Sequence, residues 1–85
     1  MTKELEIFKK RILYRASYRG TKEMDILLSS FVKKYINKFD KEQLNQLEKF
    51  LMFEDEVIKN YYNFDIIEND IDKNSISKIF KKFKI

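Results

Sequence analysis

The chain has no cysteine, no histidine and no proline, and it has one glycine among its 85 residues. Without cysteine it has no disulfides, thiolate nucleophiles or cysteine-ligated zinc, and without histidine it lacks the commonest general base and metal ligand. A single glycine cannot build the glycine-rich phosphate cradle of a P-loop or a dinucleotide site. We therefore expect no enzyme activity, no metal site and no tightly bound cofactor.

The composition is typical of one folded domain. Hydrophobic residues make up 44% of the chain and charged residues 38%, so it is too apolar for disorder and too often interrupted by charge for a transmembrane segment. A chain of 85 residues holds a single modest core. We predict one helical domain over residues 1–85, most simply a monomer.

No targeting segment is recognisable. The N-terminal residues lack the apolar run of a signal peptide, and Glu4 and Glu6 are unlike a mitochondrial presequence, which is poor in acids. These features predict the cytoplasm of a bacterium, with a mature organellar protein as the alternative.

Apolar residues recur at steps of three and four along almost the whole chain, and no stretch alternates as a strand would. We expect helices over about residues 3–18, from the N-cap Thr21 to about Asn37, and from an Asp40/Gln43 capping box to Leu51. A short fourth helix begins at residues 54–56, a loop over 63–72 is partly held by apolar residues, and a terminal helix is capped near Asp72 or Asn74. Short connections favour antiparallel neighbours, so the predicted fold is all-α, a compact five-helix bundle. The loop-holding residues are Phe64, Ile66 and Ile67, and the predicted core stripes are Leu5, Phe8, Ile12, Ala16, Met24, Leu27, Leu28, Phe31, Tyr35, Leu44, Leu47, Leu51, Val57, Ile58, Tyr61, Tyr62, Ile76, Ile79, Phe80 and Phe83.

All the arginines lie in one short segment. Arg11, Arg15 and Arg19 are four residues apart, which predicts one shared helix face. In a chain rich in lysine, an arginine indicates a need for planar, two-pronged hydrogen bonding. Gly20 follows at once and is expected to end the helix, either with a positive φ or by allowing a close backbone approach.

The charge is also divided along the chain. Residues 1–22 carry seven bases and two acids, residues 54–72 carry seven acids and one lysine, and residues 73–85 are basic again. We expect these blocks to attract one another within the fold.

The segment from Arg11 to Asp25 resembles the signature of the SdhE family, the FAD assembly factors of succinate dehydrogenase. Its hallmark R-G-x-x-E is met by Arg19, Gly20 and Glu23. The resemblance continues through residues 44–51, the family's third helix, and through residues 55–61, similar to its D-x-D-L-x-N-W segment. Two departures lie outside the signature: Tyr61 stands where many members carry tryptophan, and a glycine that often follows is missing.

The resemblance implies that the chain binds the flavoprotein subunit of succinate dehydrogenase, and possibly that of fumarate reductase, and promotes covalent attachment of FAD to a histidine of that subunit. The nucleophile would belong to the partner, in which attachment is self-catalysed. Arg19 would clamp a carboxylate or carbonyls of the partner, Gly20 would allow close approach, and Glu23 would orient Arg19 or accept from the partner. The other residues expected on this surface are Arg11, Arg15, Asp25, Tyr14 and Tyr18.

Three alternatives stand beside this interpretation. Arg19 and Glu23 could form an ordinary ion pair across the helix break. The arginine face and the net charge of +4 could serve a small nucleic-acid-binding domain, although Glu23 and Asp25 beside that face disfavour phosphate binding. An enzyme built on Glu23 and Asp25 is disfavoured because positions two apart on a helix diverge by about 200°.

Overall fold

The computed structural model describes residues 2–84. They form five α-helices and one short 3-10 helix, with no strand among them: α1 (Thr2–Ser17), α2 (Lys22–Tyr35), α3 (Lys41–Phe50), α4 (Asp55–Phe64), η1 (Ile71–Lys73) and α5 (Ser75–Lys82). The predicted all-α bundle of five helices is confirmed.

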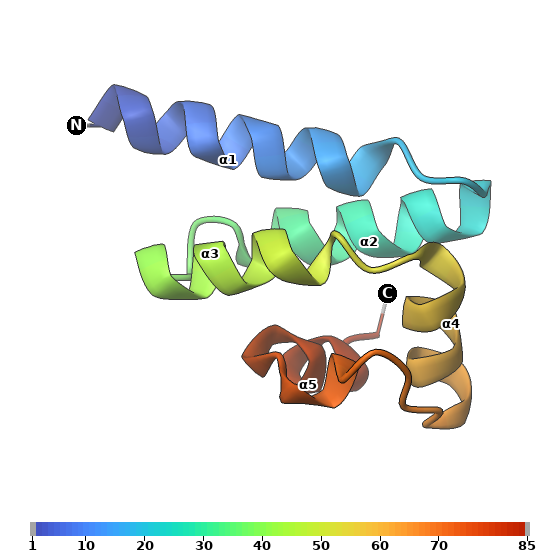
Figure 1. The fold of residues 1–85 in the computed structure, drawn as a ribbon. Helices are drawn as coiled ribbons and strands as arrows, with labels where there is room; N and C mark the ends of the chain where they lie inside the picture. The colour runs from blue at the N-terminus through green and yellow to red at the C-terminus, as the bar shows by residue number, and fades with distance from the viewer. Residues whose placement is uncertain (1, 85) are drawn as a thin grey trace.

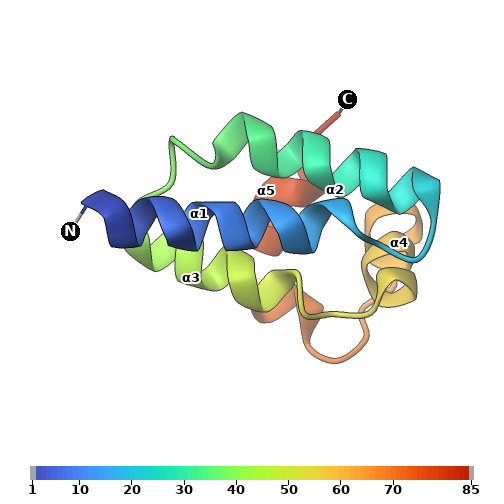
Figure 2. The same ribbon diagram turned by 90° about the horizontal axis from the view of Figure 1, so that it is seen from above.

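The helices form three levels (Figure 1). Helices α2 and α3 lie side by side, α1 lies over them, and α5 packs on the opposite side (Figure 2). Helix α4 crosses the end of this stack that is next to the α1–α2 connection. Its first turn therefore lies close to the segment that carries Arg19 and Gly20.

Local sequence signals start three of the helices as expected. The hydroxyl of Thr21 caps α2, and Asp40 and Gln43 form a reciprocal capping box at the start of α3. Asn74 caps α5, and its amide also donates to the carbonyl oxygen of Gln46 at 2.9 Å. This second bond joins the start of α5 to α3.

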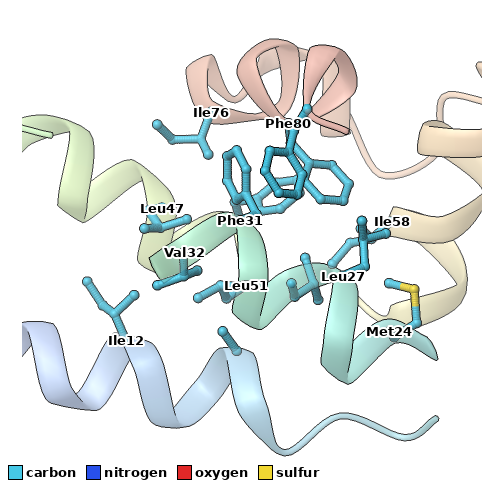
Figure 3. Packing of buried hydrophobic residues seen from close by; sticks show 14 of the residues in the cluster. Ile12, Met24, Leu27, Phe31, Val32, Leu47, Leu51, Ile58, Ile76 and Phe80 are labelled. Carbon is cyan, nitrogen blue, oxygen red and sulfur yellow. The ribbon is translucent and has the colours of Figure 1, made fainter. Parts of the chain in front are cut away.

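Phe31 of α2 is at the centre of the core (Figure 3). Its ring centroid lies 5.1 Å from that of Phe80 and 5.3 Å from that of Phe83, both in edge-on geometry. Ile12 of α1, Leu47 of α3 and the aromatic residues of the terminal segment all reach this cluster. The terminal helix is thus an integral part of the core.

Several expected details differ in the structure. Helix α1 ends at Ser17 rather than 18, and α2 ends at Tyr35 and continues as turns over residues 36–38. Leu5, predicted to be in the core, is exposed. The loop after α4 is not held by the apolar residues predicted to hold it, because Phe64, Ile66 and Ile67 are all exposed, whereas Ile71 is fully buried.

The charge blocks do attract one another. Arg19 of the basic N-terminal block pairs with Asp55, and Lys81 of the basic C-terminal block pairs with Asp65. Both acids belong to the acidic block, and they lie at the two ends of α4. Electrostatic contacts therefore help to position this helix.

Candidate partner-binding corner

The connection between α1 and α2, residues 18–21, is called the corner below. Arg19 is the only one of its side chains that turns inward, and that side chain is 10% exposed. Its Nε donates to Asp55 Oδ1 at 2.7 Å, and its two Nη atoms donate to the carbonyl oxygens of Arg15, Leu51 and Phe53 at 2.9 to 3.1 Å. One guanidinium thus joins the end of α1, the α3–α4 turn and the start of α4.

The second oxygen of Asp55 binds the glycine of the corner. The backbone N–H of Gly20 donates to Asp55 Oδ2 at 2.8 Å. A Cβ at position 20 would lie 3.2 Å from the same oxygen, which is closer than a methyl group and an oxygen normally approach. The φ angle of Gly20 is not positive, so the left-handed conformation considered for it is wrong. The close approach of the Asp55 carboxylate to its backbone is the reason for a glycine here.

Asp55 is the residue that analysis of the sequence missed. It was recognised only as part of an acidic helix start and of the family-like segment at 55–61. Its carboxylate accepts hydrogen bonds from the guanidinium of Arg19 and the backbone N–H of Gly20. It lies at the N-terminus of α4, where the helix dipole also favours a negative charge. That family-like segment was the signal that could have assigned Asp55 to the site.

Two geometric expectations for the arginines are overturned. Arg19 lies beyond the last residue of α1 and turns toward Asp55, so it does not share a helix face with Arg11 and Arg15. Arg19 also does not pair with Glu23, because its partner is Asp55, 36 residues away in the sequence. The corner is therefore closed by tertiary contacts and not by a local ion pair.

The remaining predicted residues surround the corner and face solvent. Tyr14 and Tyr18 are exposed, Tyr18 to 73%, and their ring centroids are 4.4 Å apart. Arg15 and Glu23 are exposed and Asp25 is half-buried, and none of the three has an ion-pair partner among residues 2–84. These side chains are available to a second molecule.

Glu23 also lines a shallow groove of about 320 Å³ between the first turns of α2 and the end of α4. The exposed Ile26 and the half-buried Tyr62 form part of its wall. This groove extends the exposed surface of the corner along α4.

Arg11 lies apart from the corner. It forms an ion pair with Glu48 of α3, with an Nη2–Oε2 distance of 2.9 Å, and its guanidinium lies over the ring of Phe8. With Arg11 and Arg19 both paired, the arginine face expected of a nucleic-acid-binding domain is largely neutralised.

Over residues 2–84, no group of three acidic side chains is arranged to hold a metal ion. Among the described helices, none has the length and apolar character needed to cross a membrane.

The comparison with protein families shows which family the chain belongs to. A family model described as the flavinator of succinate dehydrogenase (Sdh5) matches residues 10–84, which include the corner and all of α4. The chain belongs to the Sdh5 family. The resemblance found in the R-G-x-x-E segment is confirmed, and the family is one described as acting on succinate dehydrogenase.

Curated relatives are named as assembly factors of succinate dehydrogenase. Two are called succinate dehydrogenase assembly factor 2, mitochondrial: that of Scheffersomyces stipitis is 40% identical over 47 residues, and that of Aspergillus flavus is 40% identical over 48 residues. Assembly factor 2-A, mitochondrial, of Drosophila mojavensis is 45% identical over 47 residues. No solved structure matches the chain significantly.

The matched segments cover 55% or 56% of this chain but only 32%, 16% and 30% of the three relatives, in the order given. The names of these relatives overturn one expectation. All three are mitochondrial proteins of fungi or a fly, so the prediction of a bacterial cytoplasmic protein is wrong. The features of the N-terminal residues did not distinguish the two compartments.

Proposed function

We propose that this chain binds the flavoprotein subunit of succinate dehydrogenase and promotes covalent attachment of FAD to that subunit. The observation that carries the proposal is the corner, where Arg19, Gly20 and Asp55 are locked together while Tyr18, Arg15 and Glu23 face outward. We take the site of action to be the mitochondrion, as the names of the relatives suggest.

A rigid corner suits a factor that holds its partner in one conformation and contributes no catalytic group. A surface that is rigid before binding loses little conformational entropy on association. It can also favour one closed conformation of the partner, as long as it binds that conformation more tightly than the open one. Holding the partner's own histidine near the flavin would then accelerate attachment without a catalytic group on this chain.

We assign separate roles to the residues of the signature. Arg19 positions the corner and does not contact the partner, because its guanidinium is engaged by Asp55 and by backbone carbonyls. Gly20 permits that closure because it has no Cβ, and it allows the backbone of the partner to approach the corner closely. Glu23 and Arg15 supply an exposed acceptor and an exposed donor, with Asp25 beside them.

The adjacent, mutually tilted rings of Tyr14 and Tyr18 are the proposed anchor. Two exposed aromatic rings at a 4.4 Å centroid distance give a large contact area with few rotatable bonds. Tyrosine is among the residues that contribute most to binding energy at interfaces. Arg11 lies outside this surface in our assignment, because it is bound to Glu48.

FAD stays with the flavoprotein in this proposal, and the chain acts as a monomer without a tightly bound cofactor. The fumarate reductase flavoprotein is a second target that the same surface could serve. If both flavoproteins bind the corner, an excess of one should displace the other from this chain in a competition assay.

Co-expression with the flavoprotein subunit tests the function. We expect a one-to-one complex and covalent flavin fluorescence in the denatured subunit. Gly20→Val should abolish both, because its Cβ would push against the Asp55 carboxylate, while the helical bundle loses only about 1 to 2 kcal/mol of unfolding free energy.

The control is Ser30→Val, a half-buried position in the middle of α2, away from the corner. It should flavinylate the subunit at the native rate. A Gly20→Val protein that also works at the native rate would show that the corner is not the contact surface.

A further inference from the structure

The connection between α4 and η1 exposes three neighbouring apolar side chains. Phe64, the last residue of α4, is 65% exposed, Ile67 is 57% exposed, and Ile66 is also exposed. Exposed apolar side chains that gather on a protein surface commonly mark a site of interaction. Residues 64–67 are called the apolar loop below.

The apolar loop is held firmly at its start. Helix α4 ends with Asp65 in the left-handed conformation, and the N–H of Ile66 bonds back to the carbonyl of Asn60 at 3.2 Å. Lys81 of α5 pairs with the Asp65 carboxylate at 2.5 Å, and its ammonium also donates to the carbonyl oxygens of Tyr61 and Tyr62. One lysine thus fixes the last turn of α4 to the terminal helix.

The far end of the loop is fixed as well. Asn69 and Asp70 both have left-handed φ values, 54° and 58°, and the next residue, Ile71, is fully buried. Asp65 is left-handed as well, at 59°, and aspartate and asparagine adopt this conformation more readily than other non-glycine residues. The chain maintains this geometry while its apolar side chains stay in solvent, so the loop presents them in a defined arrangement.

The charge around the apolar loop indicates what it would bind. Residues 63–72 contain four acids and no base. Lys81 and Lys73 pair with Asp65 and Asp70, but Glu68 and Asp72 have no ion-pair partner in the part of the chain that the structure describes. A complementary surface is apolar with basic groups at its edge, and anionic lipid or nucleic acid would be repelled.

We propose that the apolar loop is a second contact surface for the flavoprotein subunit, with an apolar depression rimmed by lysine or arginine as its counterpart. This inference rests on the proposed function. Helix α4 connects the two surfaces, because Asp55 at its first residue holds the corner and Asp65 follows its last. Ten helical residues separate them by about 15 Å, so one partner can contact both (Figure 1).

Two isoleucines give a matched test. Ile67 on the loop and Ile7 on α1 are both 57% exposed, so replacing either by asparagine removes the same side chain from an equally exposed position. Titration calorimetry with the purified succinate dehydrogenase flavoprotein subunit should show an affinity about tenfold lower for Ile67→Asn and an unchanged affinity for Ile7→Asn. Glu68→Lys should also weaken binding, and raising the salt concentration should reduce the difference from the native protein.

The outcomes separate the two proposals. If the native chain does not bind the subunit, the proposed function fails. If the native chain and both isoleucine variants bind equally, the proposed function stands and the role of the apolar loop is refuted. Equal losses of affinity for both variants would also refute it, since any exposed apolar side chain would then contribute to binding non-specifically. Sedimentation that shows a dimer disrupted by Ile67→Asn, or binding to anionic vesicles through the loop, would assign it to a different occupant and overturn the proposal.

Discussion

At the scale of the residue, one carboxylate explains the two best-defined positions of the signature. Asp55 uses one oxygen for Arg19 and the other for the backbone of Gly20, so arginine and glycine are required for the same structural reason. The guanidinium also satisfies carbonyl groups at the α3–α4 turn, where helix termini leave acceptors without partners. A lysine cannot make this set of bonds, because it lacks the planar fork.

We therefore predict that Arg19→Lys lowers the free energy of unfolding by about 2 kcal/mol, since the partly buried oxygens of Asp55, Leu51 and Phe53 lose their donors. Covalent flavin per flavoprotein subunit should fall sharply as the corner loosens. Urea denaturation followed by circular dichroism measures the first effect, and flavin fluorescence of the denatured subunit measures the second.

Arg11→Lys is the control for this prediction. Arg11 is half-exposed and pairs with Glu48 away from the corner, so the loss should stay below about 0.5 kcal/mol with little change in flavin yield. Equal, near-native values for both lysine variants would mean that only total charge matters at these positions.

At the scale of the element, α4 is held at its two ends by different means. The carboxylate of Asp55, its first residue, accepts a hydrogen bond from Arg19. The carbonyl oxygens of Tyr61 and Tyr62 in its last turn accept from the ammonium of Lys81 on α5. Lysine near a helix C-terminus also complements the helix dipole. Both surfaces proposed to contact the partner are therefore fixed by long-range ionic contacts to α4.

Lys81→Met should lower the free energy of unfolding by about 1 to 2 kcal/mol, because two carbonyl groups of α4 and the Asp65 carboxylate lose their cation. Thermal denaturation measures the loss. Lys82→Met removes a neighbouring exposed lysine that has no ion pair within residues 2–84 and should change stability by less than about 0.5 kcal/mol. The contribution assigned to Lys81 would be disproved by equal effects of the two changes.

At the scale of the whole molecule, the chain is a stack of helices around a core rich in aromatic rings, with the two proposed contact surfaces on the outside. The core around Phe31 unites α2, α3 and the terminal segment, so the two surfaces are displayed on one folded unit. In the proposed function, such a unit acts by presenting a preformed surface to the flavoprotein subunit.

The isolated chain should accordingly bind FAD weakly or not at all. Its single glycine cannot form a phosphate cradle, and any residual affinity should come from exposed bases such as Arg15 and disappear as salt is raised. Titration followed by flavin fluorescence, at low and at high ionic strength, measures this. Tight binding that resists salt would shift the mechanism from holding the partner toward delivering the cofactor.

The sequence by itself determined the helices, most of their ends and the family. Helical periodicity and caps such as Thr21, Asp40 and Asn74 act between residues within a few positions of one another, so they can be recognised without a fold. The R-G-x-x-E segment identified the family for a similar reason, since its residues are contiguous.

Only the tertiary structure decided how those residues are used. Arg19 and Asp55 are 36 positions apart, and no local rule pairs them in preference to Arg19 and Glu23. The exposure of Phe64, Ile66 and Ile67 was equally inaccessible, because an apolar side chain is expected to be buried until packing shows that no other element covers it. Contacts between distant segments depend on how the helices stack, and that arrangement is a property of the whole core.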